Sequence, residues 1–220
     1  MQVYYVLVFA LAIIALVLVY ALLKFFNVKL IKGNITTKNI TGAAVLSAVE
    51  IVLIVISNYI TIGPVNLNLS LVPIAVGAML FGPVVGGFLG LINGAITVLS
   101  PSTLAVFMPI SPVGTVLVCL LKTTIAGIVA GLIFKAFKNH RHTGSFVSSI
   151  LVPIINTGLF VVGCYLFFQS WLNVGAVGYD NSFMFLLFAV MGWNFLIEVG
   201  IAAILSPSVY VIVRYFSKNR

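Results

Sequence analysis

Charged residues are scarce in this chain. Of its 220 residues, 11 are Lys or Arg and three are Asp or Glu, so that only 6% are charged, against about 25% in a soluble domain. Hydrophobic residues make up 62%. So few charges cannot cover a water-facing surface, and the composition therefore predicts an all-α integral membrane protein. Because a spanning helix needs about 20 apolar residues, the length allows about seven spans and no soluble domain.

Motifs of nucleotide-driven and hydrolytic chemistry are also missing. The sequence has no G-x-x-x-x-G-K-[ST] loop, no H-E-x-x-H motif and no Ser/His/Asp set. Cys119 and Cys164 lie in apolar runs without metal-site spacing, and His140 and His142 have no nearby Cys or carboxylate. We therefore expect a protein that is not an enzyme and holds neither a cofactor nor a metal.

The basic residues gather in three clusters, at residues 24–38, 135–141 and 214–220, and each cluster flanks an apolar run. Lys and Arg are retained on the cytoplasmic side of membranes and face its anionic leaflet. This arrangement favours a topological role over a nucleic-acid surface, which would need a basic stripe on a folded face. We expect a multi-pass protein of the cell membrane with its N-terminus outside and its C-terminus in the cytoplasm.

Seven apolar runs fit between these clusters. A first helix is expected at residues 3–26, followed by a basic linker. Six further helices are expected at residues 42–61, 71–81, 84–99, 113–134, 146–168 and 183–213. The third is short for a membrane core of about 30 Å, so it either starts earlier or is covered by its neighbours. The chain thus divides into an extra transmembrane helix with its linker at 1–41 and a six-helix domain at 42–220.

Small residues recur at helical spacing. Gly82, Gly86, Gly90 and Gly94 form one stripe, and a shorter one follows at residues 127 and 131. Such stripes let helix backbones approach closely, so we interpret them as packing faces within the molecule. Near the start of the second span, Ala44-x-x-x-Ala48 forms a similar surface, for which intramolecular packing and docking of a partner helix both remain open.

Three charged residues, Glu50, Lys122 and Glu198, lie deep inside the expected spans and away from their ends. A charge in the bilayer core costs about 3 kcal/mol or more, so each marks a site or a buried pair. Glu198 lies one turn beyond Asn194 on the same helical face. Lys122 can therefore contact a ligand, or it can pair with Glu198 or Glu50 and only hold the bundle together.

At a rise of about 1.5 Å per residue, Asn93, Lys122, Trp193 and Asn194 lie at similar depths. Together they predict a pocket open to the outside for a small polar organic ligand. The ammonium suits a carboxylate or phosphate, and the indole suits an apolar wall. Asn156, near the middle of the sixth span, is either a ligand contact or an interhelical bridge. The polar residues of the outer loops are interpreted as solvated loop rather than as lid contacts: Asn66, Asn68, Ser100 and Ser102.

From about residue 42 onward the chain resembles a substrate-binding S component of an energy-coupling factor (ECF) vitamin transporter. The resemblance is carried by the order and spacing of several segments rather than by one motif. These are the Ala44-x-x-x-Ala48 pair, LSLVPIAVGAMLFGPVVGGFLG at 69–90, LLKTTIAGIVAGLIFK at 120–135, PIINTGLF at 153–160 and WNFLIE at 193–198.

The resemblance implies a membrane-embedded, high-affinity vitamin-binding subunit of an ECF-type ABC transporter. It also implies a transmembrane coupling subunit and two cytoplasmic ATPase subunits as partners, with Ala44 and Ala48 at the docking position. Lys122 stands where relatives often carry Arg. Lysine keeps the positive charge of arginine but lacks its bidentate fork.

Pantothenate is the first expected substrate, because its carboxylate suits Lys122 and its hydroxyl and amide groups suit Asn93 and Asn194. A pyrimidine precursor, a folate or a corrinoid remains open. The alternative from another class is a stand-alone secondary permease for a small polar solute. Such permeases normally contain an inverted repeat, and no convincing repeat relates the two halves of this sequence.

Overall fold

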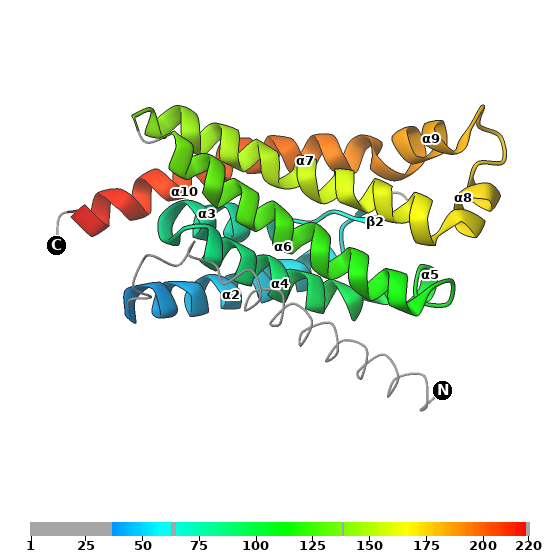
Figure 1. The fold of residues 1–220 in the computed structure, drawn as a ribbon, viewed down its shortest axis with the longest axis horizontal. Coiled ribbons are helices and arrows are strands. Elements are labelled where there is room, and N and C mark those ends of the chain that lie inside the picture. Colours follow the sequence, from blue (N-terminus) through cyan, green and yellow to red (C-terminus); the bar gives the residue numbers. More distant parts are fainter. Residues whose placement is uncertain (1–36, 63–64, 138, 219–220) are drawn as a thin grey trace.

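The computed structural model describes residues 37–62, 65–137 and 139–218 (Figure 1). The helix expected at residues 3–26 lies outside these residues. That helix, and with it the division of the chain at residue 41, stays a prediction.

The described chain is a bundle of helices. Six of the described helices correspond to the expected spans: α2 (Thr37–Ser57), α3 (Leu71–Phe81), α4 (Pro83–Val98), α6 (Pro112–Ala136), α7 (Arg141–Phe167) and α10 (Gly192–Lys218). Shorter elements join them: α5 (Pro101–Val106), α8 (Gln169–Gly175), α9 (Ser182–Phe185) and the π-helical turn η2 (Leu186–Met191). Two short antiparallel strands, β1 (Thr61–Ile62) and β2 (Val65–Asn66), pair Thr61 with Asn66 in the connection from α2 to α3.

The bundle confirms the predicted fold class. Within the described residues, four helices are long and apolar enough to cross a membrane, at Asn39–Ser57, Pro112–Ala136, Arg141–Phe167 and Gly192–Ile212, and α3 and α4 are shorter apolar helices. The prediction for residues 71–81 matches α3 to the residue. The last expected span is divided, because η2 separates α9 from α10.

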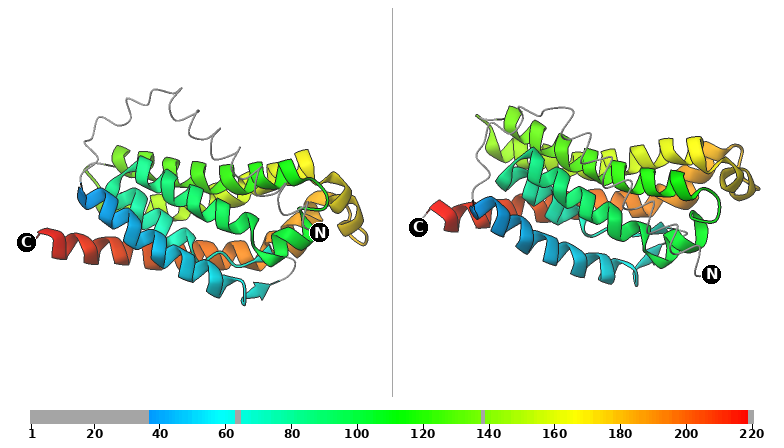
Figure 2. Two further views of the ribbon diagram at one scale, coloured as in Figure 1. Left: turned by 90° about the horizontal axis from the view of Figure 1, so that it is seen from below. Right: turned by 60° about the horizontal axis from the view of Figure 1, so that its bottom comes forward.

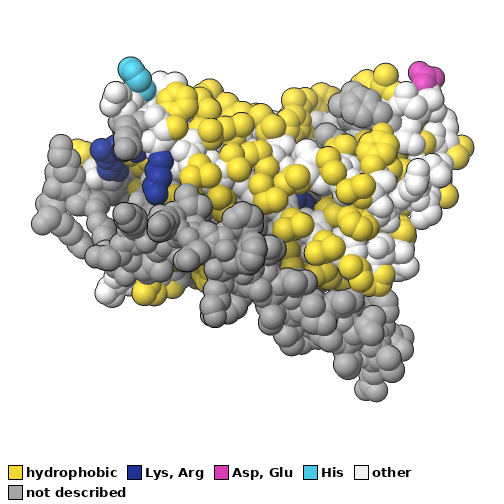
Figure 3. Space-filling model, viewed as in Figure 1, with side chains coloured by type: hydrophobic (Ala, Val, Ile, Leu, Met, Phe, Trp, Pro, Cys, Tyr) yellow, Lys and Arg dark blue, Asp and Glu magenta, His cyan; other side chains and the backbone are white. Residues whose placement is uncertain are grey.

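Charge is distributed as a membrane protein requires. On the face seen in Figure 3, hydrophobic side chains cover the middle of the molecule, Lys, Arg and His gather near one end, and the acidic side chain lies at the other. The C-terminus and the α6–α7 connection lie at one end of the bundle, and α5, α8 and α9 lie at the opposite end (Figures 1 and 2). The polar ends and the apolar belt between them describe a multi-pass membrane protein.

Helix α3 can be short because protein covers it. It packs against α2, α4, α6, α7 and α10, and eight of its 11 residues are buried. The helix ends at Gly82, whose φ of 97° lies in the left-handed region that glycine adopts without strain. Pro83 then starts α4 at a position where no backbone N–H is needed. The Gly-Pro turn therefore reverses the chain within two residues.

The glycine stripe of α4 packs directly on the backbone of α6. A Cβ atom on Gly86 would lie 2.5 Å from the carbonyl oxygen of Gly127, and one on Gly94 would lie 2.5 Å from that of Cys119. Between them, the Thr123 hydroxyl donates to the Gly90 carbonyl oxygen at 2.5 Å. The packing interpretation of the stripe is therefore confirmed. The α6 backbone approaches α4 closely because the α4 positions in contact have no side chain.

Replacing Gly90 with Ala should destabilise the bundle, because the new methyl group would overlap the backbone of Thr123 and Thr124. Overpacking of this kind costs about 1–3 kcal/mol. Thermal unfolding in detergent should show a melting point several degrees lower for Gly90→Ala. Gly200 is the matched control, since a Cβ there meets nothing within 4 Å and Ala favours the helix. Equal melting points for Gly90→Ala and Gly200→Ala would contradict the packing account.

Candidate functional site

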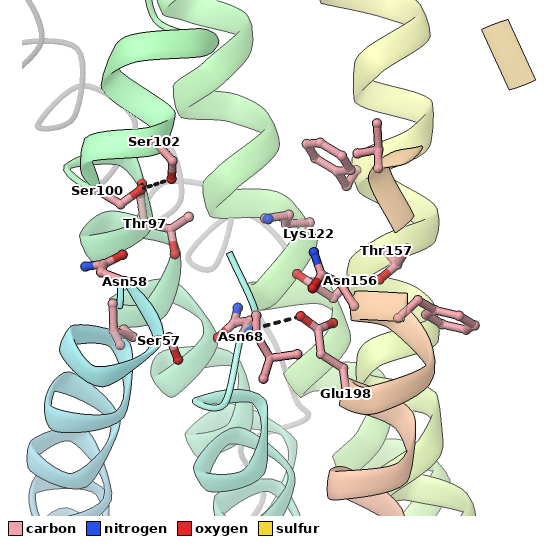
Figure 4. A pocket seen from close by; sticks show the side chains of 16 residues that line it. Ser57, Asn58, Asn68, Thr97, Ser100, Ser102, Lys122, Asn156, Thr157 and Glu198 are labelled. Atoms are coloured by element: carbon pink, nitrogen blue, oxygen red, sulfur yellow. Dashed lines mark hydrogen bonds between the residues drawn. The ribbon is translucent and has the colours of Figure 1, made fainter. Parts of the chain in front are cut away.

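A cavity of about 730 Å³, adjoining solvent included, lies between α2, α4, α6, α7 and α10 (Figure 4). The wall mixes polar and apolar side chains, contributed by Ile54, Ser57, Asn58, Leu67, Asn68, Thr97, Ser100, Ser102, Lys122, Asn156, Thr157, Phe160, Val190, Asn194, Phe195 and Glu198.

Lys122 supplies the positive charge of the cavity. It projects from α6, and its Nζ atom lies 5.2 Å from the centre of the Phe160 ring on α7. The face of an aromatic ring attracts a cation at this distance. In the described part of the chain no carboxylate oxygen lies within 4.0 Å of Nζ, so Lys122 forms an ion pair with neither Glu198 nor Glu50. The ammonium group therefore remains available to a ligand.

Glu198 supplies the acidic side chain of the cavity. It projects from α10, its side chain is 8% exposed, and its Oε1 atom accepts a hydrogen bond of 2.8 Å from the backbone N–H of Asn68 (Figure 4). This contact ties the connection between β2 and α3 to α10. The cavity thus holds one cation and one carboxylate that do not form an ion pair with each other.

A hydrogen-bond cluster behind the wall fixes Asn68. The Asn68 side chain donates to Asn93 Oδ1 at 3.4 Å and accepts from the Ser70 hydroxyl, which in turn accepts from Asn93 Nδ2. Leu69 adds a bond of 3.1 Å from its backbone N–H to the hydroxyl of Ser57 on α2. Asn93 is fully buried and does not line the cavity. Through its hydrogen bonds to Asn68 and Ser70, Asn93 fixes the position of the wall residue Asn68.

Two further amides face the cavity. Asn156 on α7 and Asn194 on α10 each have a side chain that is 5% exposed and lines the wall. Among the described residues the Oδ1 atom of Asn156 has no hydrogen-bond donor. A buried polar atom without a partner is costly, so this oxygen is suited to accept a hydrogen bond from a ligand.

Trp193 does not reach the cavity, although its depth suggested that it would. Its side chain is 71% exposed on the surface of α10. The side of α10 that faces the cavity carries Asn194, Phe195 and Glu198, and Trp193 points away from it. The aromatic side chain expected in the wall is instead that of Phe160. It lies four residues after Asn156 on the same face of α7, and this spacing could have identified it from the sequence.

The outer-loop residues contribute more than expected. The structure places three of them in the cavity wall rather than in solvent: Asn68, Ser100 and Ser102.

Glu50, the third charge in the apolar runs, does not line the cavity. It is fully buried on α2, and within the described residues neither of its carboxyl oxygens has a hydrogen-bond partner.

These features define a class: a multi-pass membrane protein with a cavity between its helices that is lined by polar and apolar side chains. Residues 38–210 match the family model described as "ECF transporter, substrate-specific component", and the chain belongs to this family. Over 159 residues it is 29% identical to the pantothenic acid transporter PanT of Lactococcus lactis subsp. cremoris, an alignment that covers 66% of this chain and 76% of that protein. No solved structure matches the chain.

The family match confirms the resemblance inferred from the sequence. The chain is the membrane-embedded, substrate-specific component of an ECF-type transporter, which takes up vitamins or related micronutrients. The family is one of transport components and not of enzymes, and it implies coupling and ATPase subunits as partners.

Asn93 provides a test of the cluster behind the cavity wall. Asn93→Leu should leave the polar groups of Asn68 and Ser70 without their buried partner, at a cost of about 1–3 kcal/mol in the free energy of unfolding. Thermal unfolding should therefore show a clear loss of stability. Asn173→Leu, at an exposed position on α8, is the control and should unfold like the unmodified protein. An Asn93→Leu variant of undiminished stability would show that the cluster does not hold the wall.

Proposed function

We propose that this chain captures pantothenate, or a vitamin with the same arrangement of groups, in the cavity around Lys122. The observation that carries the proposal is the Lys122 ammonium group, which faces the cavity without an ion pair in the described part of the chain. An unpaired charge at membrane depth is costly unless it serves a ligand. The similarity to a transporter of pantothenic acid adds support.

The remaining groups of pantothenate match the other side of the cavity. The vitamin carries a carboxylate at one end, hydroxyl groups at the other and an amide between them. With the carboxylate at Lys122, its donor groups can reach the acceptor oxygens of Asn156 and Glu198. Ile54, Leu67 and Val190 offer apolar contact to its carbon atoms. Charge-assisted hydrogen bonds to Lys122 supply the strongest single contact in this arrangement.

The proposal includes the partners and the orientation. The coupling subunit and two ATPases on the cytoplasmic side supply the energy, and the bundle reorients as a body after it has bound the vitamin outside. Ala44 and Ala48 are exposed one turn apart on α2 and form the proposed docking face. The basic end of the bundle, which contains Lys135 and Arg141, faces the cytoplasm together with the C-terminus, and the N-terminus lies outside.

Removal of the ammonium group should weaken pantothenate binding. Hydrogen bonds to charged groups are worth about 1.5–3 kcal/mol, so Lys122→Met should raise the Kd for pantothenate about tenfold or more in isothermal titration calorimetry. Lys122→Arg keeps the charge and should retain part of the affinity. Lys135→Met removes an exposed charge at the far end of α6 and should leave the Kd unchanged. An unchanged Kd in Lys122→Met would remove Lys122 from the site.

The docking face can be tested separately from ligand binding. Ala44→Trp combined with Ala48→Trp should prevent co-purification with the coupling subunit, because two large side chains block close helix contact. The Kd for pantothenate should stay the same. The matched control places two Trp side chains at Val162 and Leu166, which are exposed on α7 at the same spacing. Normal complex formation and uptake in the α2 variant would contradict the proposed face and favour a stand-alone permease.

A further inference from the structure

The two ionisable side chains that line the cavity lie on different helices. The Lys122 Nζ atom on α6 lies 5.2 Å from the centre of the Phe160 ring. Glu198 projects from α10 toward the backbone of Asn68 (Figure 4). Within the described residues no ion pair joins them. A ligand in the cavity can therefore contact the Lys122 ammonium group and the Glu198 carboxyl group separately.

The Glu198 carboxylate is held in place. Its side chain is 8% exposed, and the N–H group that it accepts from belongs to the main chain of Asn68, whose side chain is bound to Asn93 and Ser70. The carboxylate cannot turn into solvent without breaking this contact. It consequently presents its carboxyl group at a fixed position to whatever occupies this part of the cavity.

No second basic side chain balances a further negative charge. Of the described residues that line the cavity, Lys122 alone is basic. A ligand with one anionic group satisfies Lys122 and can donate hydroxyl or amide hydrogens toward Glu198. A ligand with a second anionic group at its far end places that group beside a carboxylate of the same sign, in surroundings that screen charge poorly.

We propose that Glu198 is a specificity-determining residue that admits ligands with one anionic end and rejects those with an anionic group at both ends. For the substrate of the proposed function, on which this inference rests, the rejected ligand is the phosphate ester formed on the terminal hydroxyl. Repulsion of the wrong ligand by a group of like charge is an established route to specificity. The transporter thus takes up the free vitamin and leaves its phosphorylated form outside.

The test compares Kd values for pantothenate and for its terminal phosphate ester in purified protein. The unmodified protein should bind the phosphate ester at least 100-fold more weakly. Glu198→Gln, which keeps the shape and removes the charge, should narrow this ratio at least tenfold, even if both affinities change. Asp180→Asn makes the same change of net charge at an exposed position between α8 and α9, and it should leave the ratio unaltered.

A second comparison uses the unmodified protein alone and separates charge from size. In the dimethyl ester of the same compound the phosphate group is uncharged but larger. It should bind more tightly than the phosphate ester because Glu198 does not repel an uncharged group. If the dimethyl ester binds more weakly than the phosphate ester, size and not charge excludes the phosphate group, and the inference is overturned. An unchanged ratio in Glu198→Gln has the same consequence and leaves pantothenate as the substrate. If pantothenate itself does not bind, the proposed function fails and the inference fails with it.

Discussion

The cavity depends on one contact, the backbone-to-backbone packing of α4 on α6. Side-chain-free positions at Gly86, Gly90 and Gly94 let the two helices touch, and the Thr123 hydroxyl joins them through the Gly90 carbonyl oxygen. With Thr123 turned to α4, the preceding residue points about 100° away, toward α7 and the cavity. The same packing that stabilises the bundle therefore directs the Lys122 side chain toward the cavity.

The polar groups of the bundle divide into those that satisfy one another and those that do not. Asn68, Ser70 and Asn93 form a closed cluster that fixes the wall behind the cavity. Lys122 and the carbonyl oxygen of Asn156 face the cavity without an ion-pair or hydrogen-bond partner among the described residues. Because buried polar groups in a membrane are costly unless they are satisfied, the proposed function assigns this second set to the ligand.

Much of the fold could be predicted from the sequence because hydropathy and glycine spacing act locally. The bounds of α3 and the packing face of α4 followed from such patterns, as did the shared face of Asn194 and Glu198. Depth along a helix, however, does not fix direction around it, and Trp193 consequently faces outward. The place of Asn68 in the wall depends on the path of the β2–α3 connection, which no local pattern specifies.

The central claim is that the cavity binds an anionic vitamin by its single charged end at Lys122. The most direct measurement is an experimental structure of the purified protein with pantothenate bound. The account predicts the carboxylate within hydrogen-bond distance of the Lys122 Nζ atom, about 2.7–2.9 Å for such a charged pair. It also predicts the hydroxyl end directed toward Glu198. A carboxylate turned away from Lys122, or a ligand bound outside this cavity, would contradict the account.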